Sequence, residues 1–169
     1  MSEIDIPVSQ VDRIRLPHTL RSEVIVHLLQ CAPNEGVGML GVHTPVRTDT
    51  GIEAVAAVFI PGRNTEASPV RYTMDPQDVV TAFRSFREQG VQLGAIVHSH
   101  LRGPATPSTS DVNEWNYPEA LMLIASFAEQ PPALQAWRLV EKDGMAIVQN
   151  VPIHLDTETR GSESLSGEA

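Results

Sequence analysis

Two histidines, a serine and an aspartate lie close together in the segment HSHLRGPATPSTSD. His98 and His100 are separated by one residue, and Ser108 and Asp111 follow them. The apolar stretch 91–97 directly precedes the histidines and predicts a strand. Residues two apart on a strand project from the same face, so both imidazoles can reach one cation. Two imidazole nitrogens and one carboxylate oxygen are a ligand set typical of catalytic zinc, with the fourth position left for a water molecule.

A short helix is expected to carry the third ligand. The pattern predicts this helix from about residue 110 towards residue 117, with Asp111 in its opening turn. Ser108 or Ser110 can cap the free backbone amides at its start. The aspartate can then point back to the end of the strand, where the histidines lie.

The remaining elements follow no regular alternation. The sequence predicts a helix that starts at Asp75-Pro76, with the aspartate as cap, and ends at Gly90; its apolar side carries Val79, Val80, Phe83 and Phe86. A further helix is expected over 18–31, and strands over 11–16, 35–42, 51–60, 120–127, 134–140 and 145–151. This mixture predicts an α+β domain, in which helices flank one mixed β-sheet.

Length and charge limit the possible functions. The 169 residues suit one domain, which we expect over 1–155, followed by a polar, disordered tail over 156–169. The net charge of -9, from 12 basic and 21 acidic residues, argues against general nucleic-acid binding. The only cysteine, Cys31, excludes an internal disulfide. Because no apolar run approaches the length of a membrane span, we expect a soluble, cytoplasmic protein without a membrane partner.

Hydrolysis at a metal site also requires a group that moves protons, and Glu35 is the candidate. Glu35 stands at the start of an apolar strand, directly after Pro33-Asn34. Taken alone, it is better explained as a solvated residue at a strand end. Ser108 has two possible roles, as a helix cap and as a hydrogen-bond donor to the oxyanion of a tetrahedral intermediate.

Taken together, these motifs resemble the JAMM (MPN+, Mov34/PAD-1) metallopeptidase family in its compact bacterial form. The resemblance covers about residues 13–153 and depends on Glu35 in PNEGVGMLG, on Asn64 with Pro69, on Asp75-Pro76 and on HSH with PSTSD. It implies the JAB1/MPN architecture, which is related to that of the cytidine deaminases. It also implies site roles: His98, His100 and Asp111 as ligands of one zinc ion, Glu35 as general acid/base and Ser108 as oxyanion donor.

The resemblance further implies a substrate. Compact bacterial members suggest a zinc peptidase or isopeptidase that hydrolyses the amide bond after the C-terminal Gly-Gly of a ubiquitin-like sulfur carrier of the ThiS or MoaD type. A non-catalytic, zinc-containing MPN module that binds a protein partner is the alternative. Glu35 and Ser108 favour the enzyme, because a structural zinc usually has four protein ligands and needs no base. A deaminase is excluded, since one cysteine cannot supply a Pro-Cys-x-x-Cys ligand pair. The oligomeric state stays open.

Overall fold

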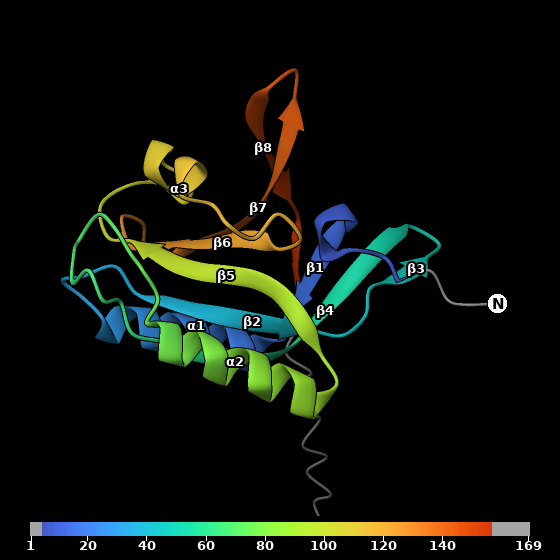
Figure 1. Ribbon diagram of the computed structural model, residues 1–169, viewed down its shortest axis with the longest axis horizontal. Helices are drawn as coiled ribbons and strands as arrows, with labels where there is room; N and C mark the ends of the chain where they lie inside the picture. The colour runs from blue at the N-terminus through green and yellow to red at the C-terminus, as the bar shows by residue number, and fades with distance from the viewer. Residues whose placement is uncertain (1–4, 157–169) are drawn as a thin grey trace, which may run out of the picture.

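A mixed nine-stranded sheet forms the centre of the computed structural model, which describes residues 5–156 (Figure 1). The strand order is β8-β7-β6-β5-β2-β4-β1-β9, with β3 paired to β4. The strands are β1 (Arg13–Leu16), β2 (Val37–Val42), β3 (Val46–Thr48), β4 (Gly51–Gly62), β5 (Gln92–His100), β6 (Leu121–Ser126), β7 (Ala133–Lys142), β8 (Met145–Val151) and β9 (Ile153–Leu155). The β5–β6, β1–β4 and β1–β9 pairs are parallel and the others antiparallel. The predicted α+β class with a mixed sheet is confirmed.

The helices are α1 (His18–Gln30), α2 (Pro76–Gln89) and the short α3 (Thr109–Asn113), preceded by a 3-10 turn at Val8–Gln10. The two longer helices cover opposite faces of the sheet. The buried side of α1, which includes Val24, packs with Leu40 and Val97, whereas Phe86 of α2 packs with Met39 and Ile96. Both faces of β2 and β5 are therefore buried, as expected of central strands.

The ends of α2 agree with the prediction, but its buried side is narrower. The Asp75 side chain accepts a hydrogen bond from the Gln77 amide, and Gly90 ends the helix with a φ of 67°. Ala82 and Phe86 are buried, but Val80 and Phe83 are 51% and 41% exposed. The predicted apolar side of this helix is therefore only partly packed, because the sheet covers the stripe around Phe86 and leaves Val80 and Phe83 exposed.

The short helix α3 also differs from its prediction. It ends at Asn113, not near residue 117. Trp115 and Tyr117 both pack against the apolar cluster that Phe86 of α2 forms with residues of the sheet. Residues two apart on a helix do not face the same side, so this packing requires the chain to leave the helix first. In Figure 1, α3 lies near the end of β5, and the β7–β8 hairpin projects beyond the rest of the sheet.

Two three-residue strands, β3 and β9, were not predicted. Both are too short to show a sequence period, and they form through pairing with β4 and β1. Apart from Asp156, which pairs with Arg15 (Oδ1 to Nη1, 3.4 Å), the predicted tail over 156–169 lies outside the described residues. The domain limits therefore stay a prediction. Within residues 5–156, no helix is long and apolar enough to cross a membrane.

Candidate metal centre and active site

The two histidines and the aspartate of the predicted metal site lie together in the structure. His98 and His100 belong to β5, on the face that Ile96 turns towards α2, and Asp111 reaches them from α3. The two Nε2 atoms are 3.2 Å apart, and Asp111 Oδ2 lies 3.3 Å from His98 Nε2 and 3.1 Å from His100 Nε2. All three side chains are buried. The cluster is compatible with a metal site.

The distances within this cluster fit a tetrahedral zinc ion. Zinc bound at about 2.0–2.1 Å by tetrahedral ligands holds the ligand atoms about 3.3 Å apart. The orientation of His100 fits as well, because its Nδ1 lies 2.7 Å from the Pro104 carbonyl oxygen. An Nδ1–H that donates to this carbonyl leaves the Nε2 lone pair directed into the cluster.

The charges in the cluster also suit a cation. Burial acts to raise the pKa of Asp111, but hydrogen bonds with His100 and His98 outweigh it and hold the pKa well below its ordinary value. Burial lowers the pKa of His98, which favours the neutral imidazole. For His100, burial acts to lower the pKa, but hydrogen bonds to Asp111 and Pro104 outweigh it and raise the pKa. A buried, ionised carboxylate requires a compensating positive charge, which a metal ion can supply.

Ser108 fixes Asp111 through a capping box at the start of α3. The Ser108 hydroxyl accepts a hydrogen bond from the Asp111 amide (3.1 Å), and the Ser108 amide donates to Asp111 Oδ2 (2.8 Å). Of the two predicted caps, Ser108 is therefore the one used, and Ser110 is not. Because Oδ2 also faces both histidines, the cap directs the carboxylate towards the cluster.

Glu35 lies beside the same cluster, just before β2. Val37 of β2 pairs with His98, and the Gly36 carbonyl accepts a hydrogen bond from the Ser99 amide (3.1 Å). In this antiparallel register Glu35 lies across from His100. A Cβ atom at Gly36 would lie 2.8 Å from Leu28 Cδ2, so glycine allows the chain to pass close to α1 at this point.

The environment of Glu35 is unusual for a carboxylate. The residue is 5% exposed, and within the described residues its Oε2 has no hydrogen-bond partner. Burial raises its pKa to about 7; His100 acts to lower it, and Asp111 acts to raise it further. A carboxyl group with a pKa near neutrality can both accept and return a proton.

The side chain of Asn64 holds the backbone around Glu35. Its Nδ2 donates to the carbonyl oxygens of Glu35 (3.0 Å) and Arg71 (2.9 Å). Its Oδ1 accepts hydrogen bonds from the amides of Glu66 and Thr73, both at 3.1 Å. In the sequence, Asn64 stands out only through the family resemblance, since nothing in its spacing indicates this role.

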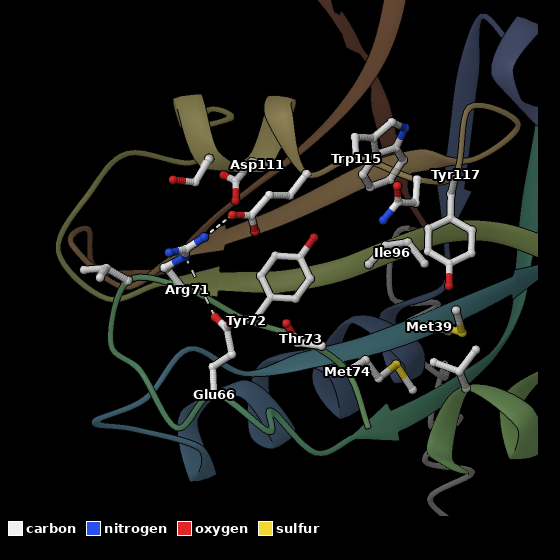
Figure 2. Close-up of a pocket in the computed structure, with 15 residues that line it drawn as sticks. Met39, Glu66, Arg71, Tyr72, Thr73, Met74, Ile96, Asp111, Trp115 and Tyr117 are labelled. Carbon is white, nitrogen blue, oxygen red and sulfur yellow. Dashed lines mark hydrogen bonds and ion pairs between the residues drawn. The ribbon is translucent and has the colours of Figure 1, made fainter. Parts of the chain in front are cut away.

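A cavity of about 450 Å³ opens next to Asp111, between the loop 63–74 and the segment after α3 (Figure 2). Tyr72 forms part of its wall, and its ring stacks on His98 with centroids 4.5 Å apart. Arg71 also lines the cavity; it forms an ion pair with Glu114, and its Nε lies 3.9 Å from Glu66 Oε2. Neither Arg71 nor Tyr72 was predicted to belong to the site, because both lie in a loop without periodicity.

Similar proteins include three with assigned names. A probable TtuB-protein conjugate cleaving protease of Thermus thermophilus is 38% identical over 106 residues, which cover 61% of this chain and 65% of the relative. A desampylase of Pyrococcus furiosus is 29% identical and covers 53% of this chain and 61% of the relative. A desampylase of Haloferax volcanii is 27% identical, with 68% and 81% covered. The chain thus matches less than two thirds of the length of the first two relatives.

Two solved structures share the fold. Protein DSY2949 from Desulfitobacterium hafniense has a TM-score of 0.72 and 32% identity, over 86% of this chain and 94% of the other. A protein from Salinibacter ruber has a TM-score of 0.58 and 26% identity, over 86% and 93%. The family model described as prokaryotic homologs of the JAB domain matches residues 17–140. The chain therefore belongs to the family of prokaryotic JAB-domain homologs.

Proposed function

We propose that this protein is a zinc-dependent peptidase or isopeptidase, with His98, His100 and Asp111 as the zinc ligands. The observation that carries the proposal is the convergence of three ligand atoms, 3.1–3.3 Å apart, beside the buried carboxyl group of Glu35. Zinc at such a site supplies Lewis-acid activation of a water molecule. Three protein ligands leave one tetrahedral position open, as in catalytic rather than structural sites.

Glu35 is the general base and then the general acid of this proposal. It takes a proton from the attacking water and delivers it to the leaving nitrogen. One C–O bond forms, the C–N bond of the amide breaks, and the products are a carboxylate and an amine. In the metal-free protein burial raises the pKa of Glu35 to about 7, which supports a carboxyl group that can hold a proton between the two transfers.

Ser108 is the proposed hydrogen-bond donor to the developing oxyanion. Its hydroxyl oxygen already accepts a hydrogen bond from the Asp111 amide. Among the described residues, the hydroxyl hydrogen itself is not donated to any acceptor. The hydroxyl is therefore free to donate to a substrate while the cap stays in place. A donor that acts only on the transition-state charge raises the rate without tightening ground-state binding.

The proposed substrate is a ubiquitin-like sulfur carrier of the ThiS or MoaD type, cleaved after its C-terminal Gly-Gly. The printed names of the relatives, a TtuB-protein conjugate cleaving protease and two desampylases, support a protein-conjugate substrate. Zinc as the metal, one ion per chain, and a cytoplasmic location belong to the same proposal.

Mass spectrometry of a carrier with a C-terminal extension tests this function. The zinc-loaded protein is compared with Glu35→Gln and with Glu23→Gln, a matched loss of one exposed carboxylate on α1. We expect the wild type and Glu23→Gln to cleave directly after the glycine pair, and Glu35→Gln to lose activity by about 100-fold or more. Full activity of Glu35→Gln would refute its role. No cleavage by the zinc-loaded wild type would overturn the proposed carrier substrate and favour another substrate or the non-catalytic binding module.

A further inference from the structure

The two histidines of the cluster are held in different ways. Histidines that bind metals usually donate their second ring N–H to an acceptor, which fixes the ring orientation. His100 follows this rule through the Pro104 carbonyl oxygen. His98 does not, because its Nδ1 is buried and has no hydrogen-bond partner within the described residues. No hydrogen bond at Nδ1 therefore helps to hold the orientation of the His98 ring.

The ring of Tyr72 makes a different contact with His98. It stacks on the His98 imidazole at a centroid distance of 4.5 Å and an interplanar angle of 27°. His98 is fully buried, and one face of its ring lies against the flat aromatic surface of Tyr72. Figure 2 shows the hydroxyl of Tyr72 pointing into the cavity, and the contact of Tyr72 with His98 is a contact between the two rings.

The backbone of Tyr72 is itself fixed from both sides by Asn64. The Asn64 side chain donates to the carbonyl oxygen of Arg71 and accepts from the amide of Thr73. The same side chain donates to the Glu35 carbonyl oxygen. One amide group therefore connects the backbone of Glu35 to the loop that places Tyr72 on His98.

We propose that Tyr72 is a positioning residue for His98, and that its stacked ring replaces the missing hydrogen bond at Nδ1. This inference rests on the proposed zinc function. A free imidazole ring turns about its χ2 angle, and the stack restricts that rotation before metal binds. Loss of the stack should therefore weaken zinc binding, as loss of the groups that orient metal ligands typically does, by about 10–100-fold.

Zinc affinity, measured by competition with a chromogenic chelator, tests the proposal without any substrate. Tyr72→Leu and Tyr72→Met remove the aromatic face, whereas Tyr72→Phe keeps it and removes only the hydroxyl. Tyr117→Leu is the matched control, because Tyr117 lines the same cavity and its ring contact is with Trp115. Thermal unfolding of each metal-free variant identifies any that does not fold.

We expect Tyr72→Leu and Tyr72→Met to bind zinc about 10–100-fold more weakly than the wild type. Tyr72→Phe and Tyr117→Leu should stay within about threefold of it, since neither removes the stacked ring. Wild-type zinc affinity in a folded Tyr72→Leu or Tyr72→Met variant would overturn the role of Tyr72 but not the proposed function. An equal loss of zinc affinity in Tyr117→Leu would do the same. A wild-type protein that binds no zinc would overturn the proposed function as well.

Discussion

The buried carboxyl group of Glu35 should reduce the stability of the metal-free protein at neutral pH. Burial raises its pKa from 4.5 to about 7 in the folded state. The folded protein therefore holds this proton more tightly than the unfolded chain does. The resulting stability is fully present below pH 4.5 and is lost as the pH rises to about 7. Glu35→Gln, which stays neutral, should escape this loss.

The pKa difference sets the size of the effect. Each pKa unit corresponds to roughly 1.4 kcal/mol, so the full shift corresponds to roughly 3 kcal/mol above pH 7. At pH 5 the free energy of unfolding of Glu35→Gln should exceed that of the wild type by only about 1 kcal/mol, because most of the pKa shift takes effect at higher pH. Urea unfolding of both proteins in a chelator, at several values between pH 5 and pH 8, measures the difference directly.

Glu53→Gln is a control of opposite sign. Hydrogen bonds from Arg13 and Arg15 lower the pKa of Glu53, so its charge stabilises the folded state at neutral pH. This contribution is present above the unfolded pKa and is lost only as the pH falls through the lower folded value. Glu53→Gln should be less stable than the wild type from pH 5 to pH 8. A Glu35→Gln protein no more stable than the wild type at pH 8, or a gain that does not change with pH, would refute the reasoning.

Three further predictions concern the residues around the cluster. Asp111→Ala should lose stoichiometric zinc, measured by metal analysis after gel filtration, and a full zinc content would mean that the ligand set is wrong. Asn64→Ala removes four hydrogen bonds and should lower the free energy of unfolding by about 2–4 kcal/mol, and an unchanged urea midpoint would contradict the role of this side chain. Gly36→Ala places a Cβ atom 2.8 Å from Leu28 Cδ2 and should lower the free energy of unfolding by about 1–3 kcal/mol in the same assay. An unchanged free energy of unfolding would show that α1 can shift to make room for the methyl group.

The histidine cluster could be predicted because its geometry follows from local rules. Two residues two apart on a strand share a face wherever that strand lies, and β5 lies where the apolar pattern indicates. Asp111 was placed correctly near the strand end, because a capped helix start directs an early side chain back towards the preceding segment. The site roles of these residues stay proposals.

The contacts of Tyr72 and Asn64 could not be predicted in the same way. Both residues lie in the loop 63–74, whose shape depends on hydrogen bonds to Glu35 and to its own backbone. No periodic pattern describes such a loop. The exposure of Phe83 has a similar cause, since the width of the buried stripe on α2 depends on the sheet and not on the helix.

Anomalous X-ray scattering at the zinc edge, from crystals of the zinc-loaded protein, tests the central claim most directly. We predict one strong peak per chain, bonded to His98 Nε2, His100 Nε2 and Asp111 Oδ2 at about 2.0–2.2 Å. A peak at other residues, or no peak between these three atoms in zinc-loaded crystals, would contradict the account.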